Sequence, residues 1–224
     1  DALARYADLG LGRDLSVDTM LARLTSKPAY RALKERHDAQ RASVVRGRTA
    51  VVLPDSTFFP EGIDFNPVTG YTYVTSVRHG TIAELSPRGD YIRDLIPRGG
   101  VGLGAVLAVR VDARRSVLWA TISAIPQLAG YDPADSARHG LLRITLPDGE
   151  ISGRWYVPPS PAGHTLGDVA IGPLGDVYVS DSGETVVYML PADSTAFRTI
   201  RHPLFRSLQG IAPAPGGKEV LVAD

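Results

Sequence analysis

One short unit recurs along most of this sequence, and it limits the possible folds more than any other feature. Each copy is an apolar strand of four to six residues that runs into a turn rich in Gly, Pro or Asp. The copies begin at residues 61, 107, 167 and 209, so successive starts are 46, 60 and 42 residues apart. The longest interval contains an insertion at residues 125–139. Internal repeats of this length are typical of stacked or radially arranged modules.

Each copy contains further strands at nearly constant distances. Second strands are predicted at 71–75, 117–121, 177–181 and 220–224, third strands at 81–85, 141–145 and 186–190, and fourth strands at 91–96, 154–157 and 197–200. Four antiparallel strands in about 42–46 residues is the unit of a propeller blade. A β-sandwich would not repeat the same four-strand unit three times. The sequence therefore predicts an all-β fold, a β-propeller.

Residues 48–224 are predicted to hold three complete blades and half of a fourth. We interpret residues 48–53 as an outermost strand that closes the ring on the last blade. Because a propeller needs at least about four blades to close, we expect further blades beyond residue 224. The chain begins with Asp1 and stops within a predicted strand, so both ends are expected to be truncated.

Residues 1–45 have a different pattern, with apolar residues at helical spacing. Asp14 and Ser16 are suitable caps for a second helix, and Pro28 suits the first turn of a third helix over residues 28–41. The charged stretch at residues 34–38 is interpreted as a solvated helix face. This segment resembles the end of a helical repeat array of the tetratricopeptide type.

Composition excludes several classes of function. The chain has 24 basic and 24 acidic residues, so its net charge gives no electrostatic basis for binding nucleic acid or an anionic membrane. No apolar run approaches the roughly 20 residues of a membrane-spanning helix. The absence of cysteine excludes disulfides, thiolate metal sites and a cysteine nucleophile. No Gly-x-Ser-x-Gly motif is present to support a serine hydrolase.

Two segments resemble a known family of six-bladed propellers. The motif Phe-Pro-Glu-Gly-Ile-Asp at residues 59–64 and the segment 167–182 resemble the senescence marker protein, gluconolactonase and luciferin-regenerating enzyme group. Motifs such as Gly-Asp-x-Tyr-Val-x-Asp are shared with NHL-repeat and strictosidine-synthase-like propellers. The resemblance implies a divalent metal, calcium or zinc, in a central channel, where it assists lactone hydrolysis. It also points to the periplasm or the extracellular space.

The family's metal ligands open the innermost strands of several blades. Carried over by resemblance, the first ligand is Glu61, and the equivalent positions are Leu107, Gly167 and Gln209. Leu107 and Gly167 have no ligating side chain, whereas Gln209 offers a neutral carbonyl oxygen. Glu61 and Gln209 are therefore the candidate metal ligands, in a set that departs from the family pattern.

Three residues are candidate catalytic groups, each with a structural alternative. Glu61 is either a metal ligand or channel base, or a carboxylate bonded to nearby backbone N–H groups. Asp168 follows the ligand position by one residue, so its side chain should face away from the channel and bond a blade turn, unless the strand slips. His164 precedes the same strand and is either a proton carrier at the channel mouth or a solvated loop residue. Trp119 and Trp155 lie on strands and are expected to fill the core between blades.

Two functions remain in competition. The first is a propeller that binds a small molecule or a protein on its channel face, with a degenerate metal site. The second is a metal-dependent lactone or ester hydrolase that uses Glu61 together with ligands from further blades. The incomplete ligand set and the adjoining helical segment favour the binding module, although the fold alone decides neither.

Overall fold

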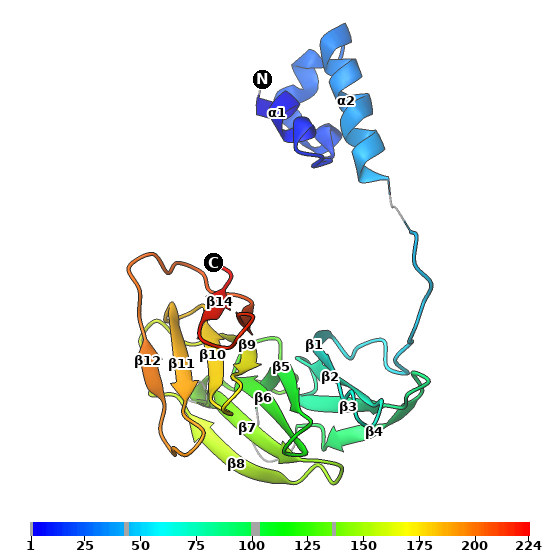
Figure 1. Cartoon of the computed structure of the whole chain (residues 1–224). Helices are drawn as coiled ribbons and strands as arrows, with labels where there is room; N and C mark the ends of the chain where they lie inside the picture. Colours follow the sequence, from blue (N-terminus) through cyan, green and yellow to red (C-terminus); the bar gives the residue numbers. More distant parts are fainter. Residues whose placement is uncertain (1, 43–44, 100–103, 136–137) are drawn as a thin grey trace. The chain divides into compact units, whose positions relative to one another are not determined.

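The computed structural model describes residues 2–42, 45–99, 104–135 and 138–224. The chain divides into two compact units, Asp1–Thr49 and Ala50–Asp224 (Figure 1). None of the helices in these described ranges combines the length and the apolar character that a membrane crossing requires.

The smaller unit is helical. It contains helices α1 (Ala2–Asp8) and α2 (Pro28–Arg41), with two short 3₁₀ helices between them at Leu15–Val17 and Thr19–Leu24. Asp14 caps the first 3₁₀ helix by accepting a hydrogen bond from the backbone N–H of Ser16. The predicted second helix is thus broken into two pieces. The break coincides with Asp18, whose carboxylate caps the next piece by accepting from the N–H of Met20.

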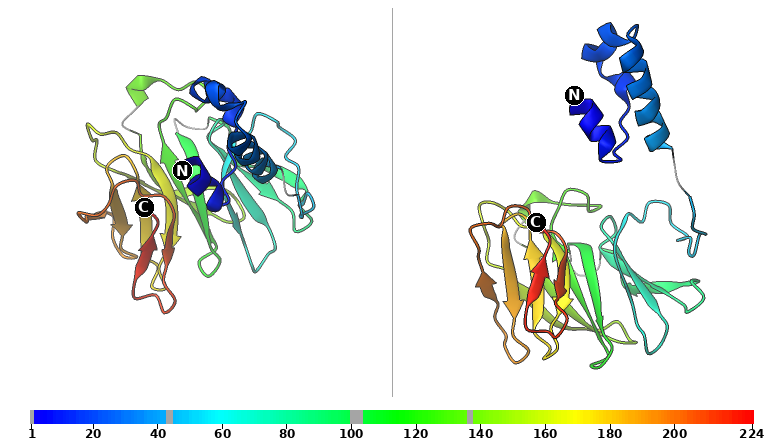
Figure 2. Two further views of the ribbon diagram at one scale, coloured as in Figure 1. Left: turned by 90° about the horizontal axis from the view of Figure 1, so that it is seen from above. Right: turned by 45° about the horizontal axis from the view of Figure 1, so that its top comes forward.

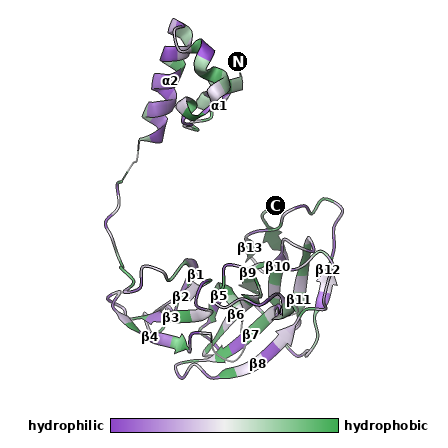
Figure 3. Ribbon diagram, turned by 180° about the vertical axis from the view of Figure 1, so that it is seen from behind, coloured by the Kyte–Doolittle hydropathy of each residue, from purple (hydrophilic) through white to green (hydrophobic). Residues whose placement is uncertain are grey.

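The charged stretch of α2 is not wholly a solvated face. Most of α2 is hydrophilic (Figure 3), but the His37 side chain is fully buried. Its Nδ1 accepts a hydrogen bond from the backbone N–H of Arg13 at 3.2 Å, and its Nε2 lies 3.0 Å from the carbonyl oxygen of Leu3. His37 therefore joins α2 to the segments before it, and the interpretation of residues 34–38 as solvated is wrong at this position.

The larger unit consists of antiparallel sheets in which successive strands pair with their neighbours in sequence. The first sheet contains β1 (Pro60–Phe65), β2 (Thr72–Ser76), β3 (Thr81–Leu85) and β4 (Tyr91–Ile96). The second contains β5 (Ala105–Asp112), β6 (Val117–Ser123), β7 (Gly140–Thr145) and β8 (Ile151–Tyr156). The third contains β9 (Leu166–Ile171), β10 (Val177–Asp181), β11 (Val186–Leu190) and β12 (Arg198–Ile200). The fourth contains β13 (Ile211–Pro213) and β14 (Val220–Val222).

The first strands of successive sheets are neighbours in space, β1 beside β5, β5 beside β9 and β9 beside β13 (Figure 2). Apolar side chains fill the layers between the sheets. One layer includes Ile82, Val109 and Leu118, and the next includes Trp119 and Val169. The outermost strands β8 and β12 are largely exposed. The core is therefore a series of layers between sheets, as expected when every sheet is apolar on two faces.

Residues 48–53 do not form the predicted strand. A β-strand needs a neighbour that completes its ladder of hydrogen bonds, and no strand within the described ranges pairs with this segment. Instead, Leu53 packs partly against the small apolar cluster around Phe58. On the same side of the first sheet, Ile63 and Phe65 are 66% and 53% exposed, whereas the equivalent Val109 is 2% exposed.

A hydroxyl on the second strand links neighbouring sheets. In the first sheet the register shifts between Pro60 and Ile63, and the N–H of Gly62 donates to the Thr75 Oγ1 at 2.7 Å. That hydroxyl donates in turn to the carbonyl oxygen of Leu107 at 2.9 Å, on the first strand of the next sheet. Gly62 is needed here because a Cβ atom would lie 2.6 Å from the same carbonyl oxygen.

The same arrangement recurs in the third sheet. The Ser180 hydroxyl accepts from the N–H of Asp168 at 3.1 Å and donates to the carbonyl oxygen of Gln209 at 2.6 Å. In the second sheet, the Thr121 Oγ1 accepts from the N–H of Ala108 at 3.0 Å. Each hydroxyl satisfies a backbone group that the irregular register would otherwise leave without a partner.

Replacement of Thr75 by Val tests this link. The variant keeps the shape of the side chain but leaves the Gly62 N–H and the Leu107 carbonyl without their buried partner, which costs about 1–3 kcal/mol of unfolding free energy. The exposed Thr199 on β12 serves as the control, because Thr199→Val should change stability by less than about 0.5 kcal/mol. Urea denaturation measures both. Equal stability of the two variants would contradict the link.

Candidate functional site

The residues predicted to open the inner strands lie near the starts of β1, β5, β9 and β13 and meet at one hollow. Glu61, Leu107, Gly167 and Gln209 all line it, and its volume is about 240 Å³. We call this space the inner-strand hollow. Its position follows from the repeat, because each of the four residues occupies the same place in its copy. The structure thus brings together the four positions that the family resemblance singles out.

Arg110 is the cation of the inner-strand hollow, and sequence reasoning missed it. Its guanidinium lies between two carboxylates, with Nη1 3.7 Å from the Asp64 Oδ1 and Nη2 3.5 Å from the Asp168 Oδ1. Its Nε also donates to the carbonyl oxygen of Val169 at 3.1 Å. The signal in the sequence was one charged residue inside the otherwise apolar run at 107–111.

Asp168 lines the hollow rather than facing away from it, so the expectation from strand alternation is wrong. The register of β9 against β10 is irregular near this residue, which turns the carboxylate inward. Its Oδ2 accepts from the N–H of Ile211 at 3.0 Å, and its Oδ1 accepts from the N–H of Val169 at 2.8 Å. Asp64 does the same two sheets earlier, in the first sheet, by accepting from the N–H of Val111 at 2.7 Å. Both carboxylates therefore hold neighbouring inner strands together.

Glu61 and Gln209 are exposed at the hollow. The Glu61 side chain forms no hydrogen bond or ion pair with any residue of the described ranges. The Gln209 amide makes one long contact, from its Nε2 to the Ser207 Oγ at 3.5 Å. The alternative in which Glu61 is bonded to backbone N–H groups is therefore not what the structure shows.

The residues present do not fit calcium or zinc. Calcium takes about six to eight oxygen ligands, and catalytic zinc needs about three protein ligands. Leu107 and Gly167 supply no side-chain donor, and Asp168 is committed to two backbone N–H groups beside the Arg110 guanidinium. Across the residues that the structure describes, no three His, Asp or Glu side chains are grouped closely enough to hold a metal ion.

His164 is neither at the hollow nor solvated, which corrects both interpretations of this residue. It does not line the hollow, and its side chain is only 3% exposed. Nδ1 lies 2.6 Å from the Asp181 Oδ2, and Nε2 lies 2.8 Å from the carbonyl oxygen of Pro158. Because both ring nitrogens face acceptors, neither is free to carry protons to a ligand.

Asp181 is the centre of a buried turn. Its Oδ1 accepts from the backbone N–H groups of Thr165 at 3.0 Å, Gly183 at 2.9 Å and Glu184 at 3.4 Å. With His164 on the other oxygen, the carboxylate bonds four groups in all. An aspartate that accepts from successive backbone N–H groups in this way caps the turn that follows β10.

Two buried tyrosines are also unsuited to proton transfer. Burial, together with the nearby charges of Asp181 and Glu184, raises the pKa of Tyr188 to about 12. Burial and the adjacent Glu84 carboxylate hold the pKa of Tyr73 well above its ordinary value. Both phenols therefore keep their protons at neutral pH.

Comparison with known proteins places the fold. No protein-family model and no curated protein matches this sequence. A solved structure of streptogramin B lyase matches with a TM-score of 0.56 at 15% identity, over 74% of this chain and 48% of that chain. Selenomethionine-substituted virginiamycin B lyase from Staphylococcus aureus matches with a TM-score of 0.46 at 13% identity, over 74% and 63%. This chain therefore spans less than two thirds of either protein.

The larger unit is a partial β-propeller. The likeness to streptogramin B lyase confirms the predicted fold class, and each four-stranded sheet is a blade. It does not support membership of the senescence marker protein and gluconolactonase group in particular. At 15% identity it shows the fold alone.

Replacement of Asp181 by Ala tests the buried turn. The change leaves His164 and three backbone N–H groups without their acceptor, so we expect a loss of about 3 kcal/mol or more in unfolding free energy. The exposed Asp148 provides the matched control, since Asp148→Ala should cost less than about 0.5 kcal/mol. Chemical denaturation followed by circular dichroism measures both. A loss of less than about 1 kcal/mol would contradict the conclusion that Asp181 holds the turn together.

Proposed function

We propose that the propeller unit is a binding module, and that its ligand presents a positively charged group to the inner-strand hollow. One observation carries the proposal: Glu61 lies exposed at the hollow and has no partner among the described residues. A carboxylate in that position is available to an incoming ligand.

The charges around the hollow favour a cation. Glu61, Asp64 and Asp168 are acidic, and Arg110 lies between the last two. Three acidic side chains thus lie around one basic side chain. Unlike charges attract over several ångströms, most strongly where water is partly excluded. An ammonium or guanidinium group is therefore the best complement to Glu61.

The size of the hollow limits what can enter. A volume of about 240 Å³ is smaller than a typical pocket for a whole drug-sized molecule, which is about 300–1,000 Å³. It suits one charged group of a larger ligand. The ligand is then a small amine or guanidine, or a Lys or Arg side chain of a protein partner, on the channel face of the propeller.

The donor set of the hollow favours binding over hydrolysis. A metal-dependent lactonase needs ligands at the places where this chain has Leu107 and Gly167. The name streptogramin B lyase describes an enzyme, but a likeness at 15% identity supports only the fold here. We therefore propose neither lactone hydrolysis nor a lyase reaction for this chain.

Calorimetric titration of the chain with n-butylamine and with arginine methyl ester tests the proposal. We expect both cations to bind, and sodium butyrate, which has the opposite charge, not to bind. Glu61→Gln should weaken binding by about fivefold or more, corresponding to the ~1 kcal/mol of a half-exposed charge pair. Glu150→Gln, a change at an exposed carboxylate in another turn, should leave binding unchanged.

Two results would contradict the binding module. Equal affinities of the Glu61→Gln and Glu150→Gln variants for the cations would place binding elsewhere. Micromolar binding of calcium or zinc that disappears in the Glu61→Gln variant, together with hydrolysis of an aliphatic lactone, would establish the hydrolase instead.

A further inference from the structure

A second cavity lies between the second and third sheets. Its volume is about 470 Å³, within the range of about 300–1,000 Å³ that small-molecule sites occupy. Its lining includes Asp112, the last residue of β5, and Val117, the first residue of β6. The inner-strand hollow is lined by the residues that open these inner strands, so the two spaces are separate.

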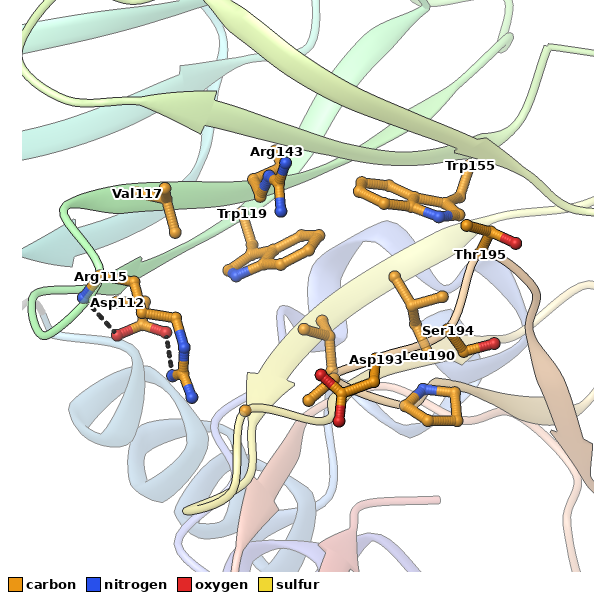
Figure 4. Close-up of a pocket in the computed structure, with 14 residues that line it drawn as sticks. Asp112, Arg115, Val117, Trp119, Arg143, Trp155, Leu190, Asp193, Ser194 and Thr195 are labelled. Carbon is orange, nitrogen blue, oxygen red and sulfur yellow. Dashed lines mark hydrogen bonds and ion pairs between the residues drawn. The ribbon is translucent and has the colours of Figure 1, made fainter.

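Both tryptophans of the chain lie on one wall of this cavity. Figure 4 shows the rings of Trp119 and Trp155 on one side, with Asp193 and Ser194 across from them and Thr195 beside Trp155. The two ring centroids are 5.4 Å apart with an angle of 42° between the planes. The cavity therefore has an aromatic wall opposite a polar one.

The aromatic wall is held in place by its own strand. At Gly153, a Cβ atom would lie 2.3 Å from the Trp155 ring, so the ring can lie over the strand only because this residue is glycine. The Arg143 guanidinium lies 5.8 Å from the centroid of the same ring, on its face. Its Nε donates to the Ser152 Oγ at 3.2 Å, which fixes the arginine.

Polar groups at the cavity remain available. Within the described part of the chain, neither indole N–H donates a hydrogen bond, and neither nitrogen is sealed from solvent. The Asp193 carboxylate and the Thr195 hydroxyl, both exposed, also have no partner among the described residues. The cavity thus offers an aromatic face, indole donors, a carboxylate acceptor and a hydroxyl.

From this arrangement we propose that the cavity is a carbohydrate site that binds a pyranose ring. The C–H face of a pyranose is apolar and stacks on an aromatic ring, while its hydroxyl groups both donate and accept hydrogen bonds around the ring edge. The hydroxyls would accept from the indole N–H groups and donate to Asp193. A purely aromatic ligand would leave these polar groups unpaired, which is unfavourable.

The placement of the tryptophans provides a direct measurement. Because the chain contains only two tryptophans and both line this cavity, intrinsic tryptophan fluorescence reports on its occupancy. The probes are methyl α-glucopyranoside, methyl α-mannopyranoside, methyl β-galactopyranoside and N-acetylglucosamine. Glycerol controls for an acyclic polyol, and phenol controls for simple aromatic stacking.

We expect at least one pyranoside to give a saturable fluorescence change that glycerol does not produce. Isothermal titration calorimetry should then give an affinity about tenfold weaker for two variants. Trp155→Ala removes the ring, and Gly153→Ala displaces it. Tyr156→Ala is the matched control: Tyr156 is the next residue of β8, is 50% exposed and does not line the cavity, so binding should be unchanged.

Circular dichroism shows whether a change to the aromatic wall prevents folding. In that case the exposed-loop variants Asp193→Asn and Thr195→Ala still test the proposal, because they leave the wall unchanged. Each should weaken binding of the same pyranoside. The proposal is overturned if no pyranoside gives a saturable change, if phenol alone does so, or if the loop variants bind as tightly as the unchanged chain.

Discussion

The hydroxyl that joins one blade to the next is the interaction on which the arrangement of the inner strands depends. At Thr75 and Ser180, a single side chain accepts from an irregular inner strand and donates to a backbone carbonyl near the start of the next inner strand. Dispersion and apolar burial hold the layers together without fixing their height relative to one another. A directional bond to Leu107 or Gln209 sets that height, because it tolerates little displacement.

The inner-strand hollow follows from this alignment. Equivalent residues of four repeats meet there because each blade is fixed to its neighbour at the same level. Asp64 and Asp168 add charged hydrogen bonds to the next strand, and Arg110 offsets the repulsion between them. Asp64 and Asp168 are thus used for structure, whereas the Glu61 side chain has no partner among the described residues and can face a ligand.

Much of the fold was predictable from the sequence because it is repetitive. Strands β3, β4, β10 and β11 have their predicted limits, since short apolar runs between turn residues leave little choice of register. Residues 48–53 were predicted as a strand because they precede the first complete blade, but a strand also requires a partner, which position in the sequence does not supply.

The site was less predictable, for reasons that concern single residues. Strand alternation placed Asp168 outside the hollow, and an irregular register moved it in. His164 is buried because Asp181, distant in sequence, accepts from it. Arg110 was not predicted because its role depends on carboxylates that two other blades contribute. Such contacts depend on tertiary neighbours, and periodicity carries no information about them.

Local unfolding is expected to differ between the blades, because one face of the first blade is less completely covered than the faces of the second and third. The second and third blades have apolar layers on both faces, whereas one face of the first blade carries only the small cluster around Phe58 and leaves Ile63 and Phe65 exposed. In a chain of modules that contact only their neighbours, stability is a sum over interfaces, and a module with fewer interfaces opens at a lower free energy. Within the described residues, amide protons of β1 and β2 therefore exchange with solvent through smaller fluctuations than those of β6 and β7, so rigidity differs between blades built from the same repeat.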